Sequence, residues 1–291
     1  MFKKAERKRA KLRLALCGPS GSGKTYSALQ MAFGMGGKVA LIDTENGSAS
    51  LYSHLGEFDV CEIAPPFTVQ KYIEAIKGAE QAGYDVLVVD SLTHAWAGQG
   101  GLLEEVDKRA SSSKSHNSYA AWRDVTPMHN RLVDTILQSN LHMIVTMRSK
   151  TAYEMEKDAN GKVAPVKKGM APIQRDGLEY EFTVVLDLDN QKHVAEAGKD
   201  RTGLFDGKVF VPTQETGKEL IEWLDSGSEP SINQKQKEQI VFLAKKLNIF
   251  EGMGSVIKQV SGADKKMAEL TESEANKVIL YLMESDKGET A

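Results

Sequence analysis

The sequence has few cysteines, no long apolar run and no pattern of metal-binding histidines, and each shortage excludes a class of protein. Two cysteines, Cys17 and Cys61, in 291 residues are too few for a disulfide framework. No apolar stretch approaches the ~20 residues that a membrane-spanning helix needs, and the amino terminus does not have the pattern of a signal peptide. We therefore expect a cytoplasmic protein without a membrane partner.

Histidine and charge are equally uninformative about ligands. The six histidines show neither H-x-x-x-H nor Cys/His ligand spacing, so we expect no protein-held zinc. A formal net charge of −3 gives no global nucleic-acid signature, so contacts with a polyanion would come from local basic clusters. A composition that is 41% hydrophobic and 26% charged fits one domain of ordinary size with a small second unit.

Short apolar runs alternate with helical patterns up to Leu224. The runs are LRLALC (12–17), VALID (39–43), VLVVD (86–90), HMIVTM (142–147) and FTVVLDL (182–188). Continuous apolar strands separated by helices indicate a mostly parallel sheet that is covered on both faces. The sequence therefore predicts an α/β domain over residues 1–224, in which residues 1–11 form a basic arm.

The composition changes after Leu224. DSGSEPS (225–231) has the character of a linker, and beyond it three segments repeat apolar residues at helical spacing. Capping-box patterns, S-I-N-Q at Ser231 and T-E-S-E at Thr271, precede the first and last of these segments. We predict a three-helix module over residues 232–291.

One stretch between the first apolar run and a helical pattern fits the phosphate-binding sequence G-x-x-x-x-G-K-[ST]. It consists of Gly18, Pro19, Ser20, Gly21, Ser22, Gly23, Lys24 and Thr25. Its glycines allow backbone N–H groups to surround a phosphate, Lys24 is able to reach the β- and γ-phosphate oxygens, and Thr25 places a hydroxyl on Mg²⁺. We expect this glycine loop to bind ATP with Mg²⁺.

Acidic residues follow two of the other strands. Asp90 ends VLVVD and would present a metal-side carboxylate at the edge of the sheet where the glycine loop lies. Asp43 ends the VALID run and Glu45 follows two residues later, on the same side of an extended chain. Glu45 is the candidate base that activates water. The alternative for each acid is a solvated side chain that only ends a strand.

A glycine loop followed by strands ending I-D-T-E and V-V-D-S resembles the RecA-like core ATPases. More specifically, residues 10–224 resemble the short, phage-encoded RecA-like ATPases of the Sak type. The resemblance implies a RecA-like core, Glu45 as general base and hydrolysis coupled to single-stranded DNA. It also implies that Tyr52 stacks on adenine, the alternative being a packed core tyrosine. Bacterial RecA senses the γ-phosphate with an asparagine–glutamine pair, whereas TMRSK (146–150) offers Thr146 or Arg148.

The K-D-R-T-G stretch resembles the lysine-x-arginine element that RecA relatives extend into the next subunit. Lys199 and Arg201 are two residues apart and would point the same way from an extended segment, toward a neighbour's γ-phosphate. This interpretation implies assembly with other copies into a ring or filament. The alternative is a solvated hairpin that turns at Phe205-Asp206-Gly207.

Residues 149–175 separate two strands by a length that is unusual for a structureless connection, and they are rich in lysine. RecA-like proteins carry a mobile loop for single-stranded DNA in this position. The candidate DNA-binding residues, chosen for phosphate contact and base stacking, are Lys150, Tyr153, Lys167, Lys168 and Arg175. The alternative is a disordered soluble loop. The basic arm would either bind phosphates or keep the terminus soluble.

These features predict a Mg²⁺-dependent ATPase that acts with single-stranded DNA in phage recombination, annealing or replication, in the host cytoplasm. One alternative is a small-molecule or nucleotide kinase. Another is a nucleotide-gated scaffold with negligible turnover, whose helical module recruits a partner such as a single-strand-binding protein.

Overall fold

The computed structural model of the protein describes residues 6–112, 117–157 and 163–288. For residues 152–157, 163–168 and 287–288 the description covers the backbone alone. The chain forms two compact units, Lys11–Trp223, and Leu224–Ala291 together with Met1–Ala10. We call the first the core unit and the second the helical unit.

A sheet of nine strands, counted over the described residues, forms the middle layer of the core unit. Its strands are β1 (Arg13–Gly18), β2 (Val39–Asp43), β3 (Asp59–Glu62), β4 (Val86–Asp90), β5 (His142–Lys157), β6 (Val163–Pro172), β7 (Val184–Leu188), β8 (Ala195–Asp200) and β9 (Val209–Phe210). The order is β3-β2-β4-β5-β1-β7-β8-β9, with β6 paired to β5. The strands from β3 to β7 in this order are parallel, which confirms the predicted class.

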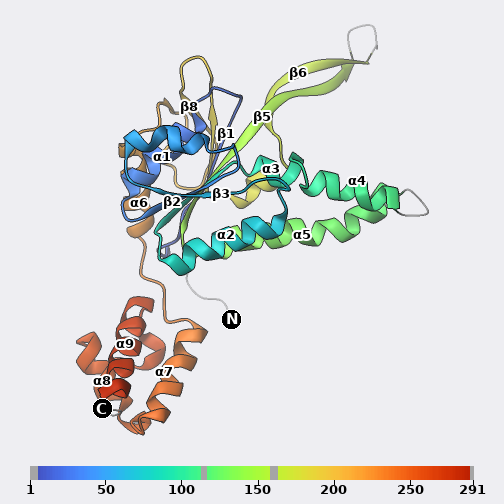
Figure 1. Ribbon diagram of the computed structural model, residues 1–291. Coiled ribbons are helices and arrows are strands. Elements are labelled where there is room, and N and C mark those ends of the chain that lie inside the picture. Colours follow the sequence, from blue (N-terminus) through green and yellow to red (C-terminus); the bar gives the residue numbers. More distant parts are fainter. Residues whose placement is uncertain (1–5, 113–116, 158–162, 289–291) are drawn as a thin grey trace. The chain divides into compact units, whose positions relative to one another are not determined.

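Helices cover both faces of the sheet (Figure 1). They are α1 (Lys24–Met35), α2 (Val69–Ala82), α3 (Thr93–Ala97), α4 (Leu102–Ser112), α5 (Ser118–Gln138) and α6 (Gln214–Asp225). Helices α1 and α6 lie over one face, and α2 and α5 lie over the other. Strands β1, β2 and β4 are consequently buried along their whole length, which explains their continuous apolar runs. Within the described ranges, none of the helices has both the length and the apolar character needed to cross a bilayer.

Helices α1 and α6 meet at a contact that only glycine permits. A Cβ atom on Gly34 would lie 1.8 Å from the carbonyl oxygen of Gln214, and one on Gly217 would lie 2.1 Å from the carbonyl oxygen of Met31. Each glycine therefore lets the backbone of the other helix approach. The position of α1, which begins at Lys24, is set in part by this backbone contact.

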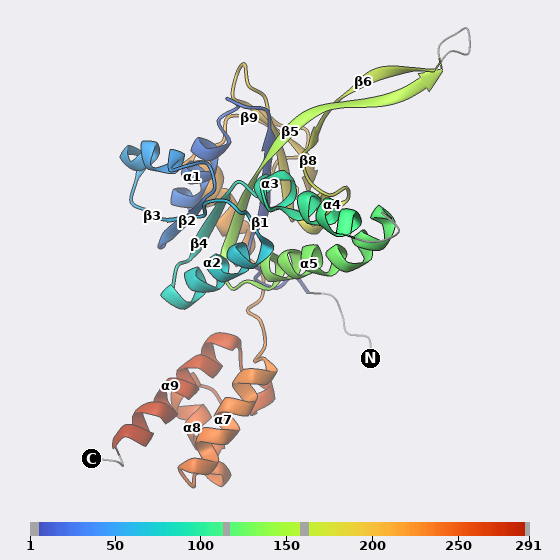
Figure 2. The ribbon, with the colours of Figure 1, turned by 45° about the vertical axis from the view of Figure 1, so that its right-hand side comes forward.

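The segment predicted as a long loop is instead a β-hairpin. Strand β5 continues to Lys157 and pairs with β6 in an antiparallel ladder, from Ser149↔Pro172 to Lys157↔Val163, with a register shift between Ala152 and Tyr153. The hairpin extends away from the rest of the core unit (Figure 2). Pro165 and Pro172 obscured it in the sequence, because proline cannot donate a ladder hydrogen bond and is confined to edge strands such as β6.

The helical unit contains the three predicted helices, α7 (Gln234–Lys246), α8 (Met253–Ser261) and α9 (Glu272–Gly288). They enclose an apolar core of their own, which includes Ile240, Ile257 and Leu282. The capping box of α9 is the predicted one, because Thr271 and Glu274 exchange hydrogen bonds of 3.0 and 3.2 Å. The capping box of α7 differs from the prediction.

Helix α7 is capped by Asn233 and Gln236 instead of Ser231 and Gln234. Asn233 Oδ1 accepts from the amide of Gln236 at 2.9 Å, and the Gln236 side chain accepts from the amide of Asn233 at 3.0 Å. The described part of the basic arm belongs to the same unit. There the amide of Arg9 donates to the carbonyl of Ser228, and the amide of Ser228 donates to the carbonyl of Arg7, each at 2.8 Å.

The glycine contact predicts that Gly34→Ala destabilises the core unit. The added methyl group has no room beside Gln214, so we expect a loss of about 1–3 kcal/mol in the free energy of unfolding. Gly78→Ala in α2 is the matched control, because a Cβ there meets no atom within 4 Å and alanine favours the helix by about 0.5–1 kcal/mol. Urea denaturation measures both. Equal stabilities for the two variants would contradict the glycine contact.

Candidate active site

The glycine loop joins β1 to α1 and leaves the first turn of that helix available to an anion. Gly21 and Gly23 have φ of +74° and +83°, a left-handed conformation that glycine adopts without steric strain. Gly23 is the N-cap residue of α1, and as a glycine it has no side chain that could cap the N–H groups of the first turn. The unpaired N–H groups and the positive end of the helix dipole therefore suit a phosphate group.

Lys24 is folded over this loop. Its Nζ donates to the carbonyl oxygen of Pro19 at 2.7 Å and to Ser22 Oγ at 3.4 Å. Burial lowers the pKa of Lys24, and the negative charges of Asp90 and Glu45 oppose that shift. The ammonium group thus lies beside the loop, in contact with neutral oxygens that a phosphate is able to replace.

Asp90 lies at the carboxyl end of β4 and is 3% exposed. Its Oδ2 accepts from the hydroxyl of Thr25 at 2.5 Å, and its Oδ1 accepts from the hydroxyl of Thr146 on β5. Burial raises the pKa of Asp90, and the two hydroxyl donors oppose this shift. Burial therefore makes the ionised form of Asp90 less favourable than that of an exposed carboxylate. The group lies next to Thr25, in the first turn of the helix that follows the glycine loop.

Glu45 follows β2 and contacts Arg148 of β5. Its Oε1 lies 2.9 Å from Arg148 Nη2 and accepts from Arg148 Nε at 3.1 Å. An arginine on this oxygen competes with a water molecule for the same acceptor. The two residues that the sequence offers separately, a candidate base and a candidate γ-phosphate sensor, are thus an ion pair in this structure.

Asp43 positions the backbone around Glu45. Its carboxylate is 2% exposed and accepts from the amide of Glu45 at 2.6 Å and from the amide of Ala49 at 2.9 Å. Ala49 belongs to the 3-10 helix η1 (Ser48–Leu55), which also carries Tyr52. The sequence pattern shows Asp43 as a second acid beside Glu45. The two hydrogen bonds from backbone amides that define its role are visible only in the structure.

These residues line one cavity of about 440 Å³. The lining combines the glycine loop with side chains predicted from sequence and with two residues that were not predicted, Ser149 and Ile173; the others are Ser20, Gly21, Gly23, Lys24, Thr25, Glu45, Tyr52, Asp90 and Arg148. Parallel strands deliver their following loops to the same edge of a sheet, which is why residues distant in sequence meet here. The cavity has phosphate-binding, acidic and aromatic groups in one place.

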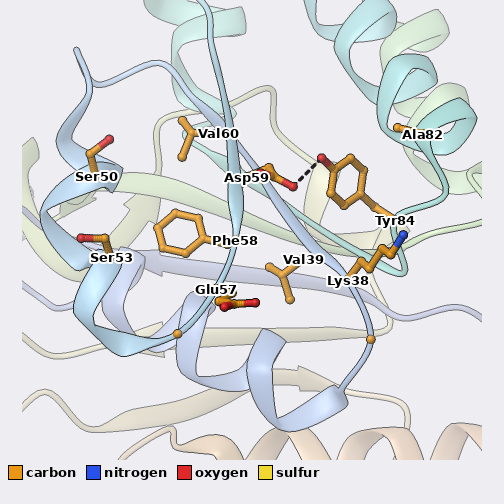
Figure 3. A pocket seen from close by; sticks show the side chains of 12 residues that line it. Lys38, Val39, Ser50, Ser53, Glu57, Phe58, Asp59, Val60, Ala82 and Tyr84 are labelled. Carbon is orange, nitrogen blue, oxygen red and sulfur yellow. Dashed lines mark hydrogen bonds between the residues drawn. The ribbon is translucent and has the colours of Figure 1, made fainter.

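A larger cavity of about 790 Å³ lies at the amino ends of β2 and β3 (Figure 3). It is lined by Lys38, Ser50, Phe58 and Val60 among others, and the hydroxyl of Tyr84 donates to Asp59 Oδ2 across it at 2.7 Å. None of the predicted site residues lines it, and it has no glycine loop. Of these two cavities, this one is the larger, but the smaller one has the phosphate-binding loop and the acidic side chains and is therefore the candidate active site.

Lys199 and Arg201 lie apart from the glycine loop of their own chain. Lys199 pairs with Val185, level with Ala15 of β1, whereas the loop begins three residues later at Gly18. Lys199 Nζ donates to the carbonyl oxygens of Glu179 and Tyr180 at 3.0 and 2.5 Å, and Arg201 Nη2 donates to Tyr180 at 2.9 Å. The pair thus holds the 3-10 helix η2 (Leu178–Glu181) and does not complete the cavity in cis.

The candidate DNA-binding residues are spread along the hairpin and beyond it. Lys150 is exposed at the point where β5 leaves the sheet, and Arg175 is half-buried after β6. Tyr153 and Lys167 face each other in the ladder by backbone register, but their side chains and that of Lys168 lie outside the described residues. The structure thus places the backbone of Tyr153, Lys167 and Lys168 on a projecting element, with Lys150 at its base and Arg175 beyond it.

A family model described as an AAA domain matches residues 10–218 of the chain. The matched segment contains the glycine loop, Glu45, Asp90, Lys199 and Arg201, and it covers almost all of the core unit. No curated protein matches the chain.

The buried charge of Asp90 predicts that Asp90→Asn stabilises the protein while it abolishes hydrolysis. Because its pKa lies above the ordinary value of 3.8, the folded state favours the protonated form, and this stability is lost as the pH rises through the folded-state pKa. Asparagine removes the charge, so the melting temperature should rise at neutral pH. A gain of 1 kcal/mol corresponds to about 2–4 °C.

The gain should shrink as the pH falls toward 3.8, where wild-type Asp90 is protonated as well. Asp189→Asn is the control of opposite sign. The pKa of Asp189 is lowered by the backbone N–H group of Lys192, so its substitution should not stabilise the protein at neutral pH. Thermal melts over a pH series measure both variants. A neutral-pH melting temperature of Asp90→Asn below wild type would contradict the assignment.

Proposed function

The chain belongs to the AAA domain family of P-loop ATPases, and we propose that within this family it is a Mg²⁺-dependent ATPase that acts with single-stranded DNA. The observation that supports hydrolysis most directly is the meeting of Lys24, Thr25, Glu45 and Asp90 around one cavity beside the glycine loop. Hydrolysis needs a phosphate clamp, a metal-side carboxylate and a base for water, and these four side chains supply them.

The residues around Asp90 fit a magnesium ion. Mg²⁺ prefers oxygen ligands and is usually held by one or two protein oxygens together with substrate phosphates. The hydroxyl oxygen of Thr25 and the carboxylate of Asp90 lie 2.5 Å apart, and Asp90 forms no ion pair among the described residues. Thr25 and Asp90 would hold the ion, which would neutralise charge on the β- and γ-phosphates when bound.

The chain's own groups account for the remaining steps. Hydrolysis forms a bond from a water oxygen to the γ-phosphorus and breaks the bond from that phosphorus to the bridging oxygen. Glu45 would accept the proton of the attacking water, and Lys24 would neutralise the charge that develops on the phosphate oxygens. Arg148 would turn from Glu45 to the γ-phosphate, with Thr146 keeping Asp90 in place.

Two features support DNA as the partner. The hairpin projects from the core unit and carries Lys150 at its base, where a polyanion would have access to it. Strand β5 also carries Thr146 and Arg148, so contact with the hairpin and contact with the γ-phosphate would be made by one strand. The resemblance to the Sak-type ATPases of phages suggests a role in recombination, annealing or replication in the host cytoplasm. The helical unit would bind a single-strand-binding protein.

A second candidate function is a nucleotide-gated scaffold with negligible turnover. The specific observation in its favour is the Glu45–Arg148 ion pair, because a carboxylate occupied by arginine is a poor base for water. This protein would bind ATP and change its assembly without hydrolysing it. Phosphate release by the wild type with saturating DNA distinguishes the two functions.

The base assignment predicts opposite behaviours for two variants. Lys24→Ala should lose ATP binding and turnover, whereas Glu45→Gln should keep ATP binding and lose hydrolysis by about 10²-fold or more. The measurement is phosphate release with and without single-stranded DNA, with equilibrium ATP binding beside it. Chelation of Mg²⁺ should stop release, and its return should restore it.

Glu222→Gln is the matched control, since Glu222 is an exposed glutamate on α6 outside the cavity. If Glu45→Gln hydrolyses ATP at the wild-type rate, Glu45 is not the base. Bound ATP without phosphate release by the wild type, even with DNA, would instead support the scaffold. Transfer of the phosphate to an added acceptor without release would identify a kinase.

Assembly is proposed from Lys199 and Arg201, which do not reach their own glycine loop. If they act in trans, Lys24→Ala and Arg201→Ala should each be inactive. An equal mixture of the two variants should regain about a quarter of wild-type activity, because about a quarter of random interfaces pair an intact glycine loop with an intact Arg201. Phosphate release over a series of mixing ratios measures this. Full activity of Arg201→Ala alone would show that it serves only to hold η2.

A further inference from the structure

A second tyrosine lies against Tyr52 beside the nucleotide cavity. Tyr26 is in the first turn of α1, directly after Lys24 and Thr25, and its side chain is 43% exposed. The rings of Tyr26 and Tyr52 are 6.4 Å apart between centroids, with an interplanar angle of 69°. This is the edge-to-face arrangement that aromatic rings prefer to a face-to-face sandwich.

Tyr52 is held from two directions. The amide of Ala49, the second residue of its helix η1, donates to Asp43, so the backbone of η1 is tied to the same carboxylate that positions Glu45. Among the described residues neither tyrosine hydroxyl forms a hydrogen bond, so the ring plane of Tyr52 is not set by its hydroxyl. The contact with Tyr26 is the described interaction that orients this ring.

The location of the pair relative to the phosphates gives it a function. Tyr52 lines the cavity together with Gly21, Gly23 and Lys24, whereas Tyr26 does not line it and contacts the ring of Tyr52 from α1, the helix that carries Lys24 and Thr25. A nucleotide with its phosphates in the glycine loop would have its base at the aromatic end of the cavity. A planar base stacks on an aromatic face, and that stacking depends on the plane of the ring.

We propose that Tyr26 is a positioning residue that orients Tyr52 as the stacking surface for the base of a nucleoside triphosphate. The proposal rests on the proposed ATPase function, because it assigns the base end of the same site. Stacking is tolerant of base identity, so Tyr26 should strengthen the binding of nucleotides that carry a base and leave the binding of the triphosphate moiety unchanged. The latter belongs to Lys24, Thr25 and the loop amides.

The experiment compares ATP with ribose 5-triphosphate, which has no base, by calorimetric titration of the full-length protein. Tyr26→Ala should weaken ATP binding by about 2- to 12-fold, the range that corresponds to an aromatic pair. Its affinity for ribose triphosphate should equal that of the wild type. Tyr26→Phe keeps the ring edge and should bind both ligands as the wild type does.

Two further variants distinguish positioning from a general loss of structure. In a Tyr52→Ala background, Tyr26→Ala should have no additional effect on ATP, because its role acts through Tyr52. Tyr119→Ala removes a tyrosine that is 85% exposed elsewhere on the core unit and should change neither affinity. Since Tyr26 is partly exposed, its removal leaves no buried cavity, and thermal melts of all variants should match the wild type.

The outcomes separate this proposal from the function on which it rests. Equal weakening of ATP and ribose triphosphate by Tyr26→Ala would overturn the proposal, because the residue would then act on the phosphate loop. Unchanged ATP binding by Tyr26→Ala, or losses that add fully to those of Tyr52→Ala, would overturn it as well while the ATPase function stands. A wild-type protein that binds neither ligand would overturn both.

Discussion

The buried carboxylate of Asp90 is the interaction on which the arrangement of the core unit depends. One side-chain oxygen binds Thr25 of α1, the other binds Thr146 of β5, and its backbone carbonyl accepts from the amide of Thr44 after β2 at 2.8 Å. A single residue thus connects β4 with the three elements that carry the other polar groups of the site. An ionised group at this depth is unfavourable unless hydrogen bonds compensate it, so the hydroxyls of Thr25 and Thr146 are required by the same burial that makes Asp90 a good metal ligand.

The two edges of the parallel sheet use buried charge for different purposes. At the amino edge, Arg13 is 6% exposed and donates to carbonyls in the last turn of α5 and just after it, among them those of Leu137 and Leu141 at 2.9 and 2.7 Å. Burial lowers the pKa of Arg13 to about 10, yet its partners are all neutral carbonyl oxygens, and three of these four lie at or just after the carboxyl end of α5, where a cation is favourable. Both terminal nitrogens of Arg13 thus have carbonyl partners, whereas its buried Nε has none among the described residues. At the carboxyl edge, Lys24 and Asp90 are desolvated without an ion-pair partner among the described residues, and a phosphate with its metal ion would satisfy both.

The sequence was informative wherever one local rule decides the structure. The five apolar runs became the central parallel strands, the glycine loop has the backbone that its glycines permit, and Thr271 caps α9. The sequence was uninformative where two residues fit the same capping position, or where the contact joins residues that are far apart in the chain. Asn233 took the cap of α7 because its side chain reaches the amide of Gln236, although Ser231 fits the pattern equally well. The Glu45–Arg148 pair and the anchoring of Lys199 and Arg201 on η2 join residues far apart in the chain, so no spacing could reveal them. The hairpin was hidden by Pro165, whose place on an edge strand is known only once the pairing is seen.

The continuity of β5 gives the core unit a mechanical property. The strand pairs with β1 as far as Arg148 and with β6 from Ser149 onward. One strand, β5, therefore both crosses the middle of the sheet and forms one half of the hairpin. Tension along β5 acts parallel to the strand axis, and the hydrogen bonds to β4 and β1 then share the load in shear instead of opening one after another. A taut polymer held by the hairpin would be felt at Thr146 and Arg148 as a displacement along the strand. One continuous strand therefore joins the hairpin to the side of the cavity that Arg148 lines.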